Sequence, residues 1–150
     1  MKGLETETMV VDCATSVFET IGPGHSEAVY HRAMEVALRL AGIQYETERV
    51  LPIVFRGHVV GNFRCDIVLE DLVVELKAVS RLGPREELQA VNYLKFSGKP
   101  RALLLNFGST LESKTVTLPL CPGSLSRLGA SLEPDEDDTV HHPFDPMEAV

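Results

Sequence analysis

The sequence lacks the features that mark membrane and secreted proteins. No apolar run approaches the ~20 residues that a membrane-spanning helix needs, and no N-terminal signal pattern is present. The three cysteines, Cys13, Cys65 and Cys121, are odd in number, widely spaced and form no CxxC pair. They therefore indicate neither a disulfide framework nor a zinc site, and small buried hydrophobes explain them more simply. We expect a cytoplasmic protein with no membrane segment.

Basic residues are absent from one end of the chain. Residues 133–150 carry seven acidic side chains and no Lys or Arg, although the net charge of the whole chain is only −8. Residues 1–132 are therefore almost neutral, with 14 basic and 15 acidic side chains. The acidic balance thus does not exclude a nucleic-acid partner, and no global basic footprint argues for one. We predict a domain over 1–120 and a tail over 121–150 that contains Gly, Ser, Pro and acids and is largely disordered from about 133.

The remaining composition is typical of a soluble globular domain. Hydrophobic residues make up 44% and charged residues 24% of the 150 residues, enough for one domain with a real core. Hydrophobic periodicity predicts helices over 6–21, 25–40 and 84–97, and strands over 44–55, 59–69, 72–79 and 101–107, with 115–118 as a short edge strand. Pro52 indicates an edge or a bulge in the first strand. The nearly unbroken apolar run 101–107 is typical of a buried, parallel strand.

The helix expected over 25–40 has two apolar rows. One row consists of Val29, Ala33, Val36 and Leu40, and we expect it to be buried. The other row begins with Glu27 and continues with Tyr30, Met34, Leu38 and Ala41. Because Glu27 begins a row that is otherwise apolar, we expect its side chain to point inward near the start of the helix.

The segment Phe63–Val79 has strand-forming side chains with Asp66, Glu75 and Lys77 in its interior. Val, Ile and Leu dominate it, and the acidic pair at 70–71 divides it, which predicts a β-hairpin. If the hairpin turns symmetrically about that pair, Asp66 stands opposite Glu75, with Cβ atoms about 5 Å apart. Lys77 shares the face of Glu75, because side chains alternate along a strand. Two facing carboxylates repel each other, so the pattern favours a divalent-metal site over an ordinary sheet.

Four motifs occur in a characteristic order along the chain. They are GxxExxY at 24–30, an Asp at 66 followed by Glu-Leu-Lys at 75–77, QxxxY at 89–93, and LLLNFG at 103–108. Together they resemble the PD-(D/E)XK nuclease-like superfamily, specifically its RecB-like and Cas4-like QxxxY members and the small bacterial proteins named for GxxExxY. The resemblance covers roughly residues 6–108. The proline of the superfamily's name is absent, since Arg64 and Cys65 precede Asp66.

This resemblance implies a fold, a cofactor and a set of site residues. The fold is a restriction-endonuclease-like α/β sandwich, in which helices flank a small central mixed sheet of four to five strands. The cofactor is Mg²⁺ or Mn²⁺, hard cations that prefer oxygen ligands. The implied metal ligands are Glu27, Asp66, Glu75 and the backbone carbonyl of Leu76. The implied catalytic residues are Glu27, Asp66, Glu75, Lys77 and Gln89, and the implied substrate contacts are Tyr30, Arg64, Arg81, Arg85, Tyr93 and Lys95.

Simpler interpretations remain open for each of these residues. A Glu-x-Lys pair is often a solvated strand face, and Tyr30 and Tyr93 are equally consistent with amphipathic core positions. Three functions therefore stay open for this chain. The first is a metal-dependent nuclease acting on DNA or RNA, the second a non-catalytic nucleic-acid-binding protein on the same fold, and the third an accessory or scaffold subunit with a protein partner or a second copy.

Overall fold

The structure, a computed structural model, describes residues 2–119, so the tail predicted over 121–150 lies outside the described residues. Two helices come first, α1 (Lys2–Ile21) and α2 (Glu27–Leu40). Three strands follow, and then a helix and two further strands complete the chain order. These elements are β1 (Glu46–Phe55), β2 (His58–Val68), β3 (Leu72–Lys77), α3 (Pro84–Ser97), β4 (Arg101–Phe107) and β5 (Leu111–Thr117). Among residues 2–119 no helix is long and apolar enough to cross a membrane.

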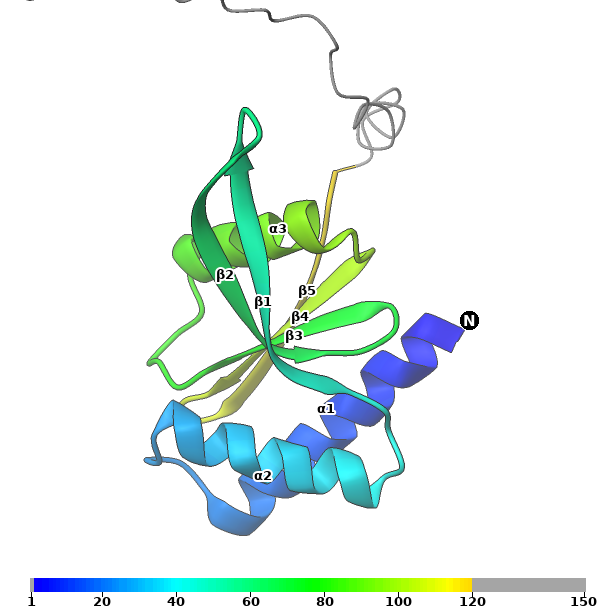
Figure 1. Cartoon of the computed structure of the whole chain (residues 1–150). Helices are drawn as coiled ribbons and strands as arrows, with labels where there is room; N and C mark the ends of the chain where they lie inside the picture. Colours follow the sequence, from blue (N-terminus) through cyan, green and yellow to red (C-terminus); the bar gives the residue numbers. More distant parts are fainter. Residues whose placement is uncertain (1, 120–150) are drawn as a thin grey trace, which may run out of the picture. The chain divides into compact units, whose positions relative to one another are not determined.

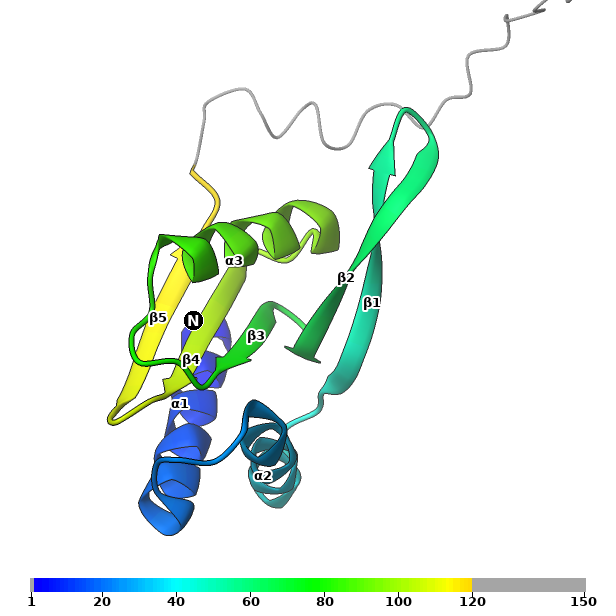
Figure 2. The ribbon, with the colours of Figure 1, turned by 90° about the vertical axis from the view of Figure 1, so that its left-hand side faces the viewer.

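The five strands form one mixed sheet in the order β1-β2-β3-β4-β5. β3 and β4 are parallel, while the other neighbouring pairs are antiparallel. Helix α3 connects the two parallel strands and covers one face of the sheet, and α1 and α2 lie against the other (Figures 1 and 2). The predicted α/β sandwich with a parallel strand over 101–107 is therefore confirmed.

The two faces of β3 pack into different cores. Leu72, Val74 and Leu76 are buried in the cluster that contains α1 and α2, whereas Val73 is buried in the cluster that contains α3. Because side chains alternate along a strand, Glu75 and Lys77 share the α3 face with Val73. The β2–β3 hairpin thus places Glu75 and Lys77 under α3, and it places the apolar face of β3 against α1 and α2.

The row of α2 that we expected to be buried is exposed. Tyr30, Met34 and Leu38 are fully buried against the sheet, but Val36 is 47% and Leu40 84% exposed. Either row of a helix with two apolar rows can pack against a neighbouring element. In this structure the row that begins with Glu27 packs against the sheet. The prediction that this row is buried is therefore wrong for Val29, Val36 and Leu40, whereas Ala33 is partly buried against the core.

The outer part of the β1–β2 hairpin, residues 50–63, forms an arm that extends beyond the sheet (Figures 1 and 2). Arg56 and Gly57 make its turn, with φ angles of 48° and 79°, as a tight hairpin turn of this hand requires. The register shifts between Ile53 and Val54, one residue after Pro52, so the predicted edge position and bulge are both confirmed. β5 begins four residues earlier than predicted, because pairing with β4 recruits the polar segment 111–114.

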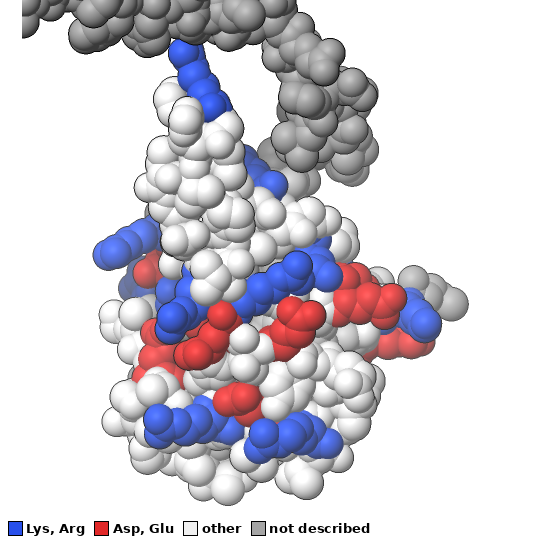
Figure 3. Space-filling model, viewed as in Figure 1, with Lys and Arg blue, Asp and Glu red and all other residues white. Residues whose placement is uncertain are grey.

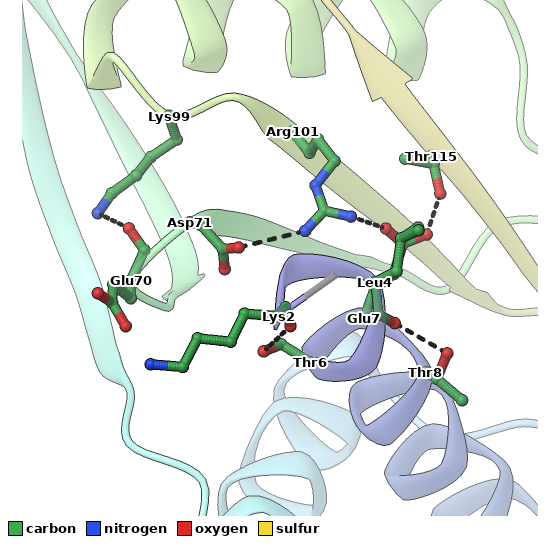
Figure 4. A network of polar contacts seen from close by, with 10 residues as sticks. All are labelled: Lys2, Leu4, Thr6, Glu7, Thr8, Glu70, Asp71, Lys99, Arg101 and Thr115. Atoms are coloured by element: carbon green, nitrogen blue, oxygen red, sulfur yellow. Dashed lines mark hydrogen bonds and ion pairs between the residues drawn. The ribbon is translucent and has the colours of Figure 1, made fainter.

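Charged side chains hold the closed end of the β2–β3 hairpin in place. Arg101 on β4 donates to Glu7 of α1 at 2.9 Å and to Asp71 of the hairpin turn at 3.4 Å (Figure 4). Lys99 donates to the backbone carbonyl of Glu70 at 2.7 Å. Arg101 is mostly buried, so these charge-assisted contacts contribute more than exposed pairs do. They anchor the hairpin at the end opposite to Asp66 and Glu75.

Candidate active site

Strands β2 and β3 separate at Asp66 and Glu75. Their backbone pairing is limited to Val68 with Val73 and Ile67 with Val74, which is the register that places Asp66 opposite Glu75. Beyond these pairs the side chains replace the backbone ladder. The Leu76 amide donates to Asp66 Oδ2 at 2.8 Å, and the Asp66 amide donates to Glu75 Oε1 at 3.4 Å. We call this opening between the two strands the fork.

Glu75 is a buried acid in the fork, with only 2% of its surface exposed. Burial, together with the negative charges of Asp66 and Glu27, raises the pKa of Glu75 to about 9, although Lys77 acts in the opposite direction. A carboxyl group in this environment stays protonated near neutral pH or needs a cation beside it. Burial and the charges of Glu75 and Asp66 also raise the pKa of the Cys65 thiol to about 11, so Cys65 offers no thiolate.

Lys77 is held by a chain of hydrogen bonds from α3. Its ammonium donates to Gln89 Oε1 at 2.9 Å, and the Gln89 amide donates to the Tyr93 hydroxyl at 3.0 Å. Gln89 and Tyr93 lie one helical turn apart, so both project from the same face of α3. Tyr93 is almost fully buried, which raises the pKa of its hydroxyl, and its ring meets Phe63 edge-on at 5.2 Å. These three sequence-predicted residues are therefore in contact with one another.

Helix α3 is fixed at both ends, which keeps this chain in place. Pro84 is its first residue, and the Glu86 carboxylate accepts a hydrogen bond from the Gly83 amide at 3.0 Å. Gly98 ends the helix with a positive φ of 69°, a conformation that glycine adopts without strain. The predicted bounds of this helix, 84–97, agree with the structure.

Glu27 lies in the first turn of α2, at the edge of the fork. Its side chain is exposed by surface area, yet nearby protein atoms desolvate it enough to raise its pKa. The charge of Lys77 lowers that pKa and the charge of Asp66 raises it, so Glu27 interacts electrostatically with both groups. One turn further along α2, the buried Nε2 of His31 has no hydrogen-bond partner among residues 2–119. Within the same residues, no three His, Cys, Asp or Glu side chains are close enough to form a ready-made metal site.

The predicted substrate contacts divide into two groups. Arg81, Arg85 and Lys95 are exposed, and Arg64 is exposed with its guanidinium 3.8 Å from Glu48. Tyr30, in contrast, is fully buried and its ring stacks on Phe107 at 4.4 Å. Its hydroxyl donates to the Gly22 carbonyl at 2.7 Å, so Tyr30 supports the turn before α2 and offers no surface to a substrate.

Asn106 is a site-supporting residue that the sequence interpretation missed. It is fully buried at the end of β4, and it makes two hydrogen bonds of 2.9 Å with the amide and carbonyl of Val79. A third bond of 2.8 Å joins it to Glu112. These contacts fix the chain immediately after Lys77. The available signal was that Asn106 is the one polar residue in the otherwise apolar run 102–107.

The comparisons with known proteins agree with this geometry. A family model of the PD-(D/E)XK nuclease superfamily matches residues 5–117, and the chain therefore belongs to this superfamily. A solved crystal structure, that of SSO0001, is similar with a TM-score of 0.51 at 20% sequence identity, covering 68% of this chain and 55% of that one. At this identity the likeness shows the fold alone, and this chain spans little more than half of that longer one. No curated protein matches the sequence closely enough to count as a relative.

Proposed function

We propose that this chain is a metal-dependent nuclease that hydrolyses phosphodiester bonds in DNA or RNA. The observation that carries the proposal is the fork, where two carboxylates face each other beside an ammonium group that α3 holds in place. Membership in the PD-(D/E)XK nuclease superfamily supports the reaction class. Within that superfamily, the GxxExxY and QxxxY motifs favour the RecB-like and Cas4-like type.

The fork fits a divalent metal by its donor chemistry. A buried Glu75 whose charge is disfavoured by Asp66 gains stability from a shared cation. The Leu76 amide donates to Asp66 on β2. Because the N–H and C=O of one strand residue point to the same side of the strand, the Leu76 carbonyl also points toward β2 and adds an oxygen ligand to the fork. Asp66, Glu75 and the Leu76 carbonyl would hold Mg²⁺ or Mn²⁺, with Glu27 acting directly or through a water. The bound ion supplies a more acidic water and neutralises charge on the phosphate.

The protein's own residues then orient the reactants. Lys77 stabilises negative charge that develops on the phosphate, or positions the attacking water, from the place where Gln89 holds it. Tyr93 orients the Gln89 amide, so its role is to position Lys77 and not to contact the substrate. Because the Lys77 ammonium has a fixed hydrogen bond before substrate arrives, it pays little reorganisation cost during the reaction.

The arm provides a surface for the nucleic acid beside the fork. Between Arg49 and Arg64 there is no acidic residue, and Arg56 stands alone at the turn. Figure 3 shows the arm as mostly uncharged, with Lys or Arg atoms at its end. A two-stranded β-ribbon fits a nucleic-acid groove, and β2 runs directly from the arm into the fork. Arg56 and Arg64, together with the exposed Arg81, Arg85 and Lys95, are the proposed phosphate contacts.

A second candidate function is nucleic-acid binding without cleavage, by this chain alone or as an accessory subunit. Two observations favour it. The described residues contain no ready-made cluster of three metal ligands, and residues 1–132 are almost neutral. A binding protein of this kind would keep the fork for structural or counter-ion purposes.

The test is a cleavage panel of single-stranded and double-stranded DNA and RNA with Mg²⁺, Mn²⁺ or EDTA. A nuclease cleaves at least one substrate only when metal is present. Binding without cleavage across the panel, with intact metal binding, supports the second candidate function instead.

A further inference from the structure

Helices α1 and α2 form a two-helix layer, and none of residues 2–119 covers its side away from the sheet (Figure 2). A groove runs between them, lined on the α1 side by Met9, Cys13 and Val17 and on the α2 side by Ala33 and Ala37. The exposed ridge of α2 borders this groove; it consists of Val29, Val36 and Leu40, which are 38%, 47% and 84% exposed. Exposed apolar side chains that border a common groove, in contrast to singly scattered surface hydrophobes, are typical of an interaction surface.

Charged residues border the apolar face with opposite signs on the two helices. On α1, Glu5, Asp12 and Glu19 recur every seven residues and are exposed; we call them the acidic row. On α2, Arg32 and Arg39 are also seven residues apart and exposed, next to the exposed ridge. None of these five side chains is in an ion pair with another residue from 2 to 119. The layer therefore carries one acidic and one basic border of the same spacing.

We propose that this face is the interface between two copies of the chain. The exposed ridge of α2 in each copy lies in the groove of the other copy. A two-fold axis along the groove brings Arg32 and Arg39 of one copy over the acidic row of the other, and the reverse contact follows by symmetry. The equal seven-residue spacings let Arg39 meet Asp12 and Arg32 meet Glu19 at the same time.

The charges also exclude the other simple arrangement. A two-fold axis across the helices would place α1 on α1 and α2 on α2, so acids would face acids and arginines would face arginines. The size of the face fits a weak dimer. α1 has 20 residues and α2 has 14, so the face is roughly 20–30 Å long and roughly 20 Å wide, about 500 Å² in projection. This is below the ~800 Å² per partner of a standard stable interface and fits a dimer that forms only at the higher protein concentrations.

This inference is independent of the nuclease proposal, because Glu75, Lys77 and their α3 partners lie on the opposite face of the sheet.

The experiment is analytical ultracentrifugation of the full chain from 1 to 200 µM. The wild type should sediment as a dimer of the 16.5 kDa chain at the upper concentrations. Val36→Glu should be monomeric and should melt at the same temperature as dilute, monomeric wild type, since Val36 is not part of the core. Leu88→Glu, at an exposed position on α3, is the matched control and should remain dimeric.

A charge exchange tests the arrangement itself. Asp12→Arg and Arg39→Asp should each weaken the dimer about tenfold, since each places like charges together twice in a symmetric pair. The double variant Asp12→Arg/Arg39→Asp should recover most of the wild-type affinity. A wild-type monomer at 200 µM, or a dimer that Val36→Glu does not weaken, overturns the proposal. A double variant no tighter than the single variants overturns the proposed axis.

Discussion

Asp66 and Glu75 each bind the backbone of the other's strand. The Leu76 amide donates to the Asp66 carboxylate at 2.8 Å, and the Asp66 amide donates to the Glu75 carboxylate at 3.4 Å. The sheet thus stops pairing through its backbone where two acids face each other. Each acid stays close to the other although their charges repel, because a backbone N–H holds it there. This arrangement costs stability in the free protein and favours a site that a cation completes.

The pKa of Glu75 makes the stability of the metal-free protein depend on pH. Its folded pKa of about 9 exceeds the ordinary 4.5, so the folded chain binds a proton that the unfolded chain releases between these values. Stability should therefore fall as pH rises from about 4.5 to 9. Glu75→Gln removes the titrating group. The free energy of unfolding of the variant should therefore exceed that of wild type by an amount that grows across that window, to a few kcal/mol at most. Urea unfolding in EDTA at pH 5 and pH 8.5 measures it.

The control for this experiment is Glu70→Gln, an exposed position in the turn of the same hairpin. It should show no pH-dependent difference from wild type. An advantage of Glu75→Gln that is equal at pH 5 and pH 8.5 contradicts the assigned cause.

Asp66→Asn tests the metal site. The amide oxygen of Asn can still accept from the Leu76 amide, so the fold should persist. Mn²⁺ or Mg²⁺ should raise the melting temperature of the wild type, because a ligand that binds only the folded state stabilises it by mass action. The variant should lose this response and be as stable as wild type or more so in EDTA. Equal metal-induced shifts of the melting temperature in wild type and variant, measured by calorimetry, would contradict the assignment of Asp66 as a metal ligand.

Asn106→Leu tests the clamp after β3. The substitution fills the buried space but removes all three hydrogen bonds of the Asn106 side chain, two of them to Val79. Unpaired backbone groups at Val79 should cost about 2–4 kcal/mol of unfolding free energy. Because Val79 follows Lys77 closely, cleavage should fall as well, even at temperatures where the variant is fully folded. Denaturant unfolding combined with activity at low temperature separates the two effects, and full activity would mean that the clamp does not position Lys77.

Arg56→Ala tests the arm as a nucleic-acid contact. Arg56 is exposed at the hairpin turn, and its guanidinium lies 5.5 Å from the ring centre of the exposed Phe55. Loss of this surface contact should cost little stability, so the fold should remain intact. Loss of one phosphate contact should weaken duplex binding uniformly across sequences and reduce the slope of log K against log salt by about one. Fluorescence anisotropy at several salt concentrations measures both quantities. An unchanged affinity and slope would remove the arm from the proposed interface.

The sequence predicted the hairpin register and the helix bounds where local signals were unambiguous. A symmetric turn about residues 70–71 predicted Asp66 opposite Glu75, and the structure has that register; Pro84 and Gly98 delimit α3. The choice between the two apolar rows of α2 was not predictable, because only the packing of α1 and the sheet decides which row is covered. Tyr30 was ambiguous for a related reason, since an amphipathic ring suits both a core and a ligand contact. The two bonds between Asn106 and Val79 join residues 27 positions apart, so no local pattern indicated them.

The central claim is that Lys77 acts in a metal-dependent cleavage reaction, and Lys77→Ala tests it most directly. The measurement is the single-turnover cleavage rate of the best substrate in Mn²⁺, with the metal-induced melting shift of the same samples as the reference. If Lys77 stabilises charge that develops during attack, the variant should keep the shift and most of the binding but lose on the order of a hundredfold in rate. A cleavage rate equal to that of wild type would contradict the account.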